Sequence, residues 1–147
     1  MAITNFRGDY KFLSNFFKCE IEYEDDVYPS VEHAFQAAKT INENERKRIL
    51  SNKNPVIAKR IGRKVKLRSD WEEVKYNIMY QLVLQKFKNN ELSRLLLDTG
   101  NNEIIEENKW HDKYWGKCIC KKCNGDGKNN LGLILQKVRD EIDEKSG

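Results

Sequence analysis

The strongest constraint on the fold is that one short stretch alternates like a β-strand, whereas helix-start signals recur along much of the chain. Over residues 17–24, charged side chains alternate with an apolar set, namely Phe17, Cys19, Ile21 and Tyr23. Period-two alternation is typical of a strand with one exposed face. Glu24-Asp25-Asp26 predicts a turn, after which Val27-Tyr28 returns beside the strand. A further short strand is expected at Ile104-Ile105-Glu106.

Several dipeptides have the character of helix starts. Pro29-Ser30 is one, because proline has the φ angle of a first helical turn and a serine oxygen can accept from free N–H groups. Asn54-Pro55 predicts a second helix start. Ser69 and Glu72 have the spacing of a capping box, and Asn90 is expected to cap a further helix. The expected helices span residues 30–41, 43–50, 56–63, 70–87, 90–97 and 131–142.

Apolar side chains at helical spacing indicate which faces of these helices are buried. In the longest predicted helix the stripe comprises Trp71, Val74, Ile78, Leu82 and Gln85. In the last helix it comprises Leu131, Ile134, Leu135, Val138 and Ile142. We therefore expect one α+β domain over residues 1–147, predominantly helical with a small antiparallel sheet. Nothing suggests a parallel βαβ unit or a dinucleotide-binding glycine fingerprint.

The composition is that of a soluble globular domain, with 39% hydrophobic and 34% charged residues. No apolar run is long enough to cross a bilayer, and the first seven residues lack the hydrophobic stretch of a signal peptide. A cytoplasmic protein without a membrane partner is expected. The net charge of +4 favours anionic ligands but is too small to indicate nucleic-acid binding by itself.

One predicted helix has a polar face that two hypotheses explain. Glu32, Gln36 and Lys39 follow one another at i, i+4 and i+7, which places them on one side of the helix. A carboxylate and an amine about 10 Å apart along the axis can flank a bound ligand. The more common explanation of such a stripe is a solvated surface, and periodicity alone favours it.

A cationic segment, Gly62–Arg68, precedes the longest helix. Arg63 and Arg68 belong to this segment, and clustered cations at helix ends suit phosphate binding, although a charged loop is the simpler explanation. Trp71 follows in the first helical turn. Its indole ring can either pack in the core or stack on a base.

The long Cys- and Gly-rich loop at residues 108–130 is the third candidate region. Carboxylates and aromatics in and just before it are typical of a ligand lid, at Glu106, Asp112 and Trp115. A lone His such as His33 or His111 is usually an ordinary packing or surface residue.

The same loop contains a cysteine triplet at Cys118, Cys120 and Cys123. Its spacing allows a structural zinc site with Cys19, His111 or Asp112 as fourth ligand. Three reduced thiols are the favoured interpretation, since two paired Cys-x-x-Cys units are lacking. We therefore expect no metal and no cofactor.

Taken together, these segments resemble the NADAR superfamily, which includes the YbiA-like proteins. The matching motifs run in order along nearly the whole chain: Phe12–Phe16, Tyr28–Lys39, Gly62-Arg63, Leu67–Trp71, Lys75, Met79, Lys86-Phe87, Thr99-Gly100, Glu106, Asp112–Gly116 and Gly127–Gly132. Each motif alone is weak, but the ordered set is specific.

The resemblance implies an N-glycosidase. Members of the family are associated with removing ADP-ribose from guanine, including ADP-ribosylated DNA, alongside a DarT-type transferase. YbiA-like members are associated with phosphoribosylamino-pyrimidine intermediates of riboflavin synthesis. The carried-over roles make Glu32 and Asp112 catalytic carboxylates and Lys39 a covalent catalyst. The substrate-binding set would be Ser14, Asn15, Gln36, Arg63, Arg68, Trp71, Glu106 and Trp115.

One departure bears on the substrate. The cysteine triplet is inserted after the Trp115-Gly116 pair, where YbiA-like proteins have a short Gly-rich stretch. We take this to favour ADP-ribosylated guanine over the pyrimidine. A non-catalytic module that binds ADP-ribose or NAD, and a zinc-dependent interaction protein, are the other classes that the sequence leaves open.

Overall fold

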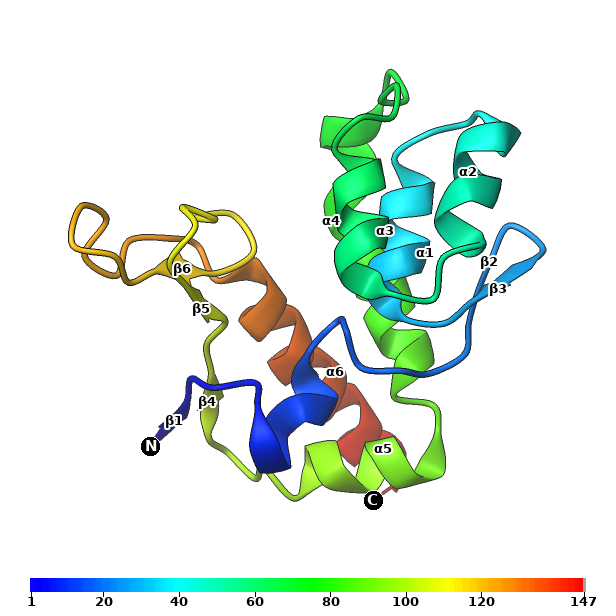
Figure 1. The fold of residues 1–147 in the computed structure, drawn as a ribbon. Helices are drawn as coiled ribbons and strands as arrows, with labels where there is room; N and C mark the ends of the chain where they lie inside the picture. Colours follow the sequence, from blue (N-terminus) through cyan, green and yellow to red (C-terminus); the bar gives the residue numbers. More distant parts are fainter. Residues whose placement is uncertain (147) are drawn as a thin grey trace. The chain divides into compact units, whose positions relative to one another are not determined.

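The computed structural model describes residues 1–146 (Figure 1). The chain forms two compact units. The central unit is Asn15–Lys86. The terminal unit combines Met1–Ser14 with the chain from Phe87 onward.

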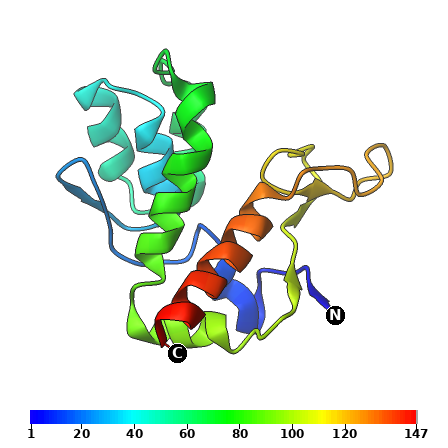
Figure 2. The ribbon, with the colours of Figure 1, turned by 180° about the vertical axis from the view of Figure 1, so that it is seen from behind.

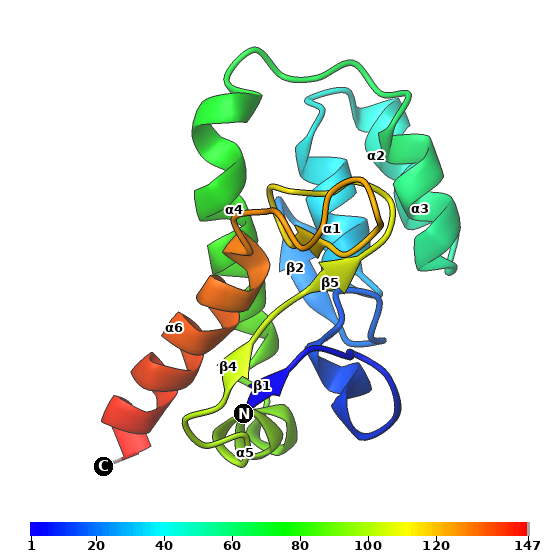
Figure 3. The same cartoon turned by 90° about the vertical axis from the view of Figure 1, so that its left-hand side faces the viewer.

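The central unit is a group of helices beside one hairpin. Its elements are β2 (Ile21–Tyr23), β3 (Asp26–Tyr28), α1 (Val31–Ala38), α2 (Glu43–Leu50), α3 (Pro55–Gly62) and α4 (Trp71–Lys86). Helix α1 packs against α2, α3 and α4, as Figure 3 shows. Every residue of α1 is buried, so this helix forms the middle of the unit.

The β2–β3 hairpin is the antiparallel pair that the alternation predicts. Ile21 lies opposite Tyr28, and Tyr23 lies opposite Asp26. Glu24 and Asp25 form the turn with φ angles of 48° and 72°. Two consecutive left-handed residues match the twist of an antiparallel ribbon, which explains the tight reversal.

Two of the predicted helix starts in the central unit are confirmed, and one is wrong. Ser30 caps α1 by accepting from the N–H of His33, and Asn54 caps α3 in the same way. The capping box at Ser69 is wrong because α4 begins two residues later, at Trp71. The carboxylate of Asp70 is instead bound by a neighbouring arginine.

The apolar stripe predicted for α4 is partly wrong. Its buried residues are Trp71, Met79, Leu82, Val83 and Lys86. Val74 and Ile78 are half-buried, and the predicted Gln85 uses its amide to bind the backbone of Glu22 in β2. The buried side of the helix is therefore rotated from the predicted one, and it includes a lysine.

The terminal unit is built from short strands and two helices. Its elements are β1 (Ala2–Ile3), η1 (Gly8–Leu13), α5 (Asn90–Leu97), β4 (Glu103–Ile104), β5 (Glu107–Asn108), β6 (Lys117–Cys118) and α6 (Asn130–Ser146). Strand β1 pairs with β4 and β5 pairs with β6, both in parallel. The expectation of a single small antiparallel sheet missed these two parallel pairs, because two-residue strands carry no periodicity.

Helix α6 supplies much of the core of the terminal unit, and the cysteine-rich segment leads into its N-terminal end (Figure 2). Its buried residues include four of the five predicted ones: Leu131, Ile134, Leu135 and Val138. Arg139 is also buried and donates to the Thr99 hydroxyl at 2.9 Å and to the Asn102 carbonyl at 2.8 Å. Helix α5 is capped by Asn89 rather than the predicted Asn90.

The observed mixture of helices and small sheets confirms the predicted α+β class. Among residues 1–146, none of the helices combines the length and apolar character that crossing a bilayer requires.

Candidate functional site

The polar face of α1 is buried, so the solvated-stripe interpretation of this helix is wrong. Glu32 is 8% exposed and Gln36 is 4% exposed, while Lys39 at the C-cap is half-buried. The Gln36 amide donates to the Glu32 carboxylate. The carbonyl of Asn15 accepts from the N–H of Glu32 at 3.0 Å, so the segment before the hairpin is joined to the first turn of α1. A carboxylate held in this way has a fixed position and little contact with water.

Gly62 explains how α3 approaches this carboxylate so closely. A Cβ atom at Gly62 would lie 1.9 Å from Oε1 of Gln36, so glycine is the residue that leaves room for the amide. Oε1 of Gln36 is buried and has no hydrogen-bond partner among the described residues. The Gly62–Gln36 contact therefore orients the amide with its donor toward Glu32.

Lys39 lies in a cationic environment that favours its neutral form. Burial is the largest influence and lowers the pKa of Lys39 below its usual value. The Glu32 carboxylate opposes this effect, whereas the cations Lys59, Arg63 and Lys75 lower the pKa further. A neutral amine is the nucleophilic form of lysine.

Arg68 has a structural role in the central unit. Its guanidinium binds Asp70 at 2.6 Å and 3.2 Å, and its backbone N–H donates to the carbonyl of Lys39 at 2.7 Å. These bonds join the segment before α4 to the end of α1. Because the Arg68 guanidinium already binds the Asp70 carboxylate, a substrate phosphate would have to compete with Asp70 for it. This competition argues against the predicted role of Arg68 in substrate binding. Arg63, in contrast, is exposed.

Trp71 packs in the core of the central unit. It is 6% exposed, and its ring lies 5.1 Å from that of Phe35 in a tilted arrangement. Of the two roles predicted for this tryptophan, core packing is the one that its burial and its contact with α1 support.

A second lysine, Lys86, is more deeply buried than Lys39. It is 3% exposed, and its ammonium lies 5.5 Å from the ring centroid of Phe17. Burial lowers the pKa of Lys86 to about 8, partly offset by Cys19. Lys86-Phe87 is one of the motifs of the family resemblance, but helical spacing did not place Lys86 on the predicted apolar stripe of α4, so its burial was not expected.

The central unit also has a pocket of about 490 Å³ beside β3 and the start of α1. Its lining includes Phe16, Val27, Tyr28, Ser30, His33 and Leu50. His33 is fully buried, with Nδ1 at 2.7 Å from the Ser30 hydroxyl and Nε2 at 2.6 Å from the carbonyl of Asn52. Both ring nitrogens have structural partners, which confirms that His33 is a packing residue.

In the terminal unit, Asp112 is held by a turn and by Asn108. One carboxylate oxygen, Oδ1, accepts from the backbone N–H groups of Tyr114 and Trp115 at 3.1 Å and 2.9 Å. The buried amide of Asn108 binds the N–H and the carbonyl of Asp112 at 3.1 Å and 2.8 Å. The backbone of Asp112 is therefore fixed, and its carboxylate is oriented by N–H donors.

Glu106 and Trp115 lie in the same unit as Asp112. The N–H of Glu106 donates to Asn129 at 2.9 Å, and its carboxylate fills the space that a side chain at Gly116 would occupy. The ring of Trp115 contacts Tyr114 edge-on, with centroids 4.7 Å apart. The predicted substrate residue Ser14 closes η1 through its N–H.

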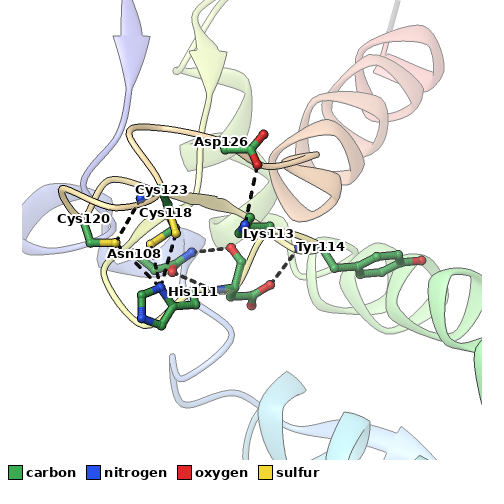
Figure 4. Close-up of polar contacts among 9 residues, drawn as sticks. Asn108, His111, Lys113, Tyr114, Cys118, Cys120, Cys123 and Asp126 are labelled. Atoms are coloured by element: carbon green, nitrogen blue, oxygen red, sulfur yellow. Dashed lines mark hydrogen bonds and ion pairs between the residues drawn. The ribbon is translucent and has the colours of Figure 1, made fainter.

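His111 joins the cysteine triplet, as Figure 4 shows. Four side chains meet here: His111, Cys118, Cys120 and Cys123. Of the three fourth ligands that the cysteine spacing allows, His111 is the one that lies beside the thiols. The sequence assigned no role to Lys59, Lys75, Asn108 and Asn129, whose contacts depend on the tertiary structure, although Lys75 and Asn129 fall within the family motifs.

Comparison with known families gives a match over almost the whole chain, because the NADAR domain model covers residues 4–143. The chain belongs to the NADAR family. It is 36% identical to the N-glycosidase YbiA of Escherichia coli K12, over 96% of this chain and 89% of that protein. The riboflavin biosynthesis protein VVA0006 of Vibrio vulnificus is 33% identical over an aligned region that covers 92% of this chain. The same region covers 36% of that longer protein.

A solved structure supports the fold independently. The NMR structure of E. coli YbiA matches with a TM-score of 0.81 and 32% identity, covering 99% of this chain and 86% of that one. The family inferred from the ordered motifs is thereby confirmed, together with the mixed fold class.

Proposed function

We propose that this NADAR protein is an N-glycosidase that hydrolyses the bond between a ribose and the nitrogen of a base. The observation that carries the proposal is the combination of the buried Glu32 carboxylate on α1 with Lys39 at the C-cap, a half-buried lysine whose pKa is lowered by burial and by surrounding cations. Support also comes from the relatives that are named N-glycosidases.

The proposed chemistry uses Lys39 as a nucleophile. When ribose is joined to an exocyclic amino group, ring opening converts the anomeric carbon into an imine. Attack by the neutral Lys39 amine forms a C–N bond, and the base departs as an amine after receiving a proton from a carboxylic acid. Water then adds to the lysine imine, releases the sugar aldehyde and restores Lys39.

Two carboxylates are assigned to proton transfer and charge stabilisation. Glu32 is buried and its charge acts on the proposed nucleophile, and a fixed, buried carboxylate stabilises a developing cation more strongly than it would in water. Asp112 is included because of the family resemblance. Its Oδ1 accepts two N–H bonds, which leaves Oδ2 as the oxygen available for a proton.

As substrate we propose ADP-ribose linked to guanine, in a nucleotide or in DNA, produced by a DarT-type transferase. The cations around Lys39 suit a ligand with a diphosphate, and Arg63 is the exposed one. A second candidate is a phosphoribosylamino-pyrimidine. It is favoured by similarity to relatives named riboflavin biosynthesis proteins, such as those of Vibrio vulnificus and maize.

The substrate is tested by offering guanine-ADP-ribosylated DNA and the pyrimidine intermediate in parallel and identifying the products by mass spectrometry. Release of unmodified guanine supports the first candidate. Cleavage of the pyrimidine alone replaces it with the second. If neither substrate is cleaved but ADP-ribose binds equally to wild type and to Glu32→Gln, the protein is a binding module.

The covalent step is tested by borohydride trapping followed by peptide mapping. An adduct on Lys39 that is absent from Lys39→Ala supports the mechanism. Lys86 is the internal control, because its pKa is also lowered but the proposal gives it no contact with substrate. An adduct on Lys86, or an undiminished adduct in Lys39→Ala, contradicts the role of Lys39.

A further inference from the structure

The Cys-His cluster of the terminal unit consists of His111, Cys118, Cys120 and Cys123. Their ligand atoms, three sulfurs and one ring nitrogen, all lie within 4.8 Å of one another. Figure 4 shows the four side chains pointing toward a common point. We propose that this cluster binds one Zn²⁺ ion as a structural site.

The distances around the histidine agree with tetrahedral zinc. Nδ1 of His111 lies 3.3 Å from the sulfur of Cys123, 3.7 Å from that of Cys120 and 3.8 Å from that of Cys118. Zinc bonds of about 2.3 Å to sulfur and about 2.1 Å to nitrogen, at tetrahedral angles, place nitrogen and sulfur about 3.6 Å apart. The three observed distances bracket this value.

Hydrogen bonding alone does not explain this arrangement. A neutral imidazole has at most one proton on Nδ1, so it can donate to one sulfur at a time. A cation at the common centre of the four ligand atoms would instead require three sulfurs at similar distances from the nitrogen, which is the arrangement seen here. Three thiolates and one imidazole form a donor set that suits zinc better than the oxygen-preferring Mg²⁺ or Ca²⁺.

The backbone around the cluster is shaped to present these ligands. The N–H of Cys123 points at the sulfur of Cys120 at 3.4 Å, a contact that favours a thiolate. Asn124 and Gly125 then turn the chain back, donating to the carbonyls of Cys120 and Cys118 at 2.8 Å and 2.7 Å. Both turn residues have positive φ angles, 51° and 84°, which Asn and Gly tolerate well.

His111 adopts a backbone conformation that a non-glycine residue seldom takes. Its φ angle is 68°, in the left-handed region, which is unfavourable for an L-residue. This conformation turns the ring toward the three sulfurs although the side chain is exposed. Metal coordination offsets such a cost, whereas a solvated histidine has no interaction that does.

A site with four protein ligands has no position for a reacting group, so the role is structural. The ion would fix the segment that carries Asp112, because His111 precedes Asp112 and Cys118 pairs with Asn108 across β5 and β6. Binding converts three thiols to thiolates and releases three protons, leaving a complex with a net charge of −1. This inference is independent of the proposed enzymatic activity.

The test is metal analysis of the purified full-length protein, prepared without chelators, by mass spectrometry for metals. About one zinc per chain is expected for wild type and for Cys19→Ser, the control thiol outside the cluster. Cys120→Ser and His111→Asn should lose most of the metal. Asparagine is chosen because it tolerates the left-handed backbone at this position.

A second measurement covers the case in which Cys120→Ser fails to fold. Co²⁺ added to metal-free wild type should give the visible bands of tetrahedral cobalt and a thiolate-to-metal charge-transfer band, both weakened in His111→Asn. No spectral change in wild type overturns the proposal. So does an intact-protein mass showing a disulfide within the triplet of freshly purified protein, or an unaltered zinc content in His111→Asn.

Discussion

The two units hold their functional side chains by different means. In the central unit, Glu32 and Gln36 project from a helix that is buried along its whole length, and their positions follow from packing. In the terminal unit, Asp112 and three members of the Cys-His cluster lie in irregular segments, where several residues have positive φ angles, while Cys118 ends the two-residue strand β6. A buried helix needs no further support, whereas an irregular loop gains its order from hydrogen bonds and, in our proposal, from a metal ion.

The largest effect is expected at the helix-based site. Glu32→Gln keeps the shape of the side chain and removes its charge, so turnover should fall on the order of 10³-fold with little change in melting temperature. The measurement is kcat for release of the base, accompanied by thermal unfolding. Glu43→Gln, an exposed carboxyl on α2, is the control. Wild-type turnover in Glu32→Gln would remove this carboxylate from the mechanism.

Metal removal should affect the loop-based region alone. A ligand present at about 1,000 times its dissociation constant stabilises the ordered loop relative to the locally opened loop by about 4 kcal/mol, and that stabilisation is lost on chelation. We expect amide exchange to accelerate in residues 107–129 and to remain unchanged in α1. Comparable acceleration in both regions, or in neither, would break the contrast between the two units.

The buried ammonium of Lys86 should make stability depend on pH. Its pKa is lowered from 10.5 to about 8, so between these values the folded state binds fewer protons than the unfolded state and stability rises with pH. At about 1.4 kcal/mol per pH unit, the free energy of unfolding should rise by about 3 kcal/mol over this range. The cost of desolvating the Lys86 ammonium is fully present below pH 8.

Denaturant unfolding of Cys19→Ser and of Cys19→Ser combined with Lys86→Met, between pH 7 and 10.5, isolates this effect. The serine removes the neighbouring thiol, whose pKa burial raises. The free energy of unfolding should rise more steeply with pH when Lys86 is present. Parallel pH profiles for the two proteins would show that the ammonium is not desolvated.

The sequence predicted the parts of the fold that local chemistry determines. The hairpin, the caps at Ser30 and Asn54, and the apolar face of α6 follow from side-chain alternation, capping oxygens and helical spacing. Two-residue parallel strands such as β5 and β6 have no such signal, since their pairing partners lie far apart in the chain. The start of α4 was misplaced because the Asp70 carboxylate is bound by Arg68 through folding of the intervening turn.

The site was predicted unevenly for the same reason. The residue types of Glu32, Gln36 and Lys39 identified the polar face, but periodicity favoured a solvated stripe because it contains no information about what packs on a helix. Burial by α2, α3 and α4 reverses that interpretation. Likewise, the Cys spacing allowed zinc without choosing among three candidate fourth ligands, and His111 is the one that its backbone conformation brings near the thiols.

The smallest predicted effect concerns the cations around Lys39. Lys59 lowers the pKa of Lys39, so Lys59→Gln should raise it. Because the neutral amine is the reacting form, the ascending limb of the pH profile of kcat/KM should move to higher pH, while the rate on its plateau stays near that of wild type. Arg60→Gln, an exposed neighbour on α3 that is not among the cations acting on Lys39, should leave the limb in place. If both variants shift the profile equally, the effect is a general loss of positive charge in substrate binding. A shift confined to Lys59→Gln shows that a cation on the neighbouring helix α3 controls the ionisation of Lys39.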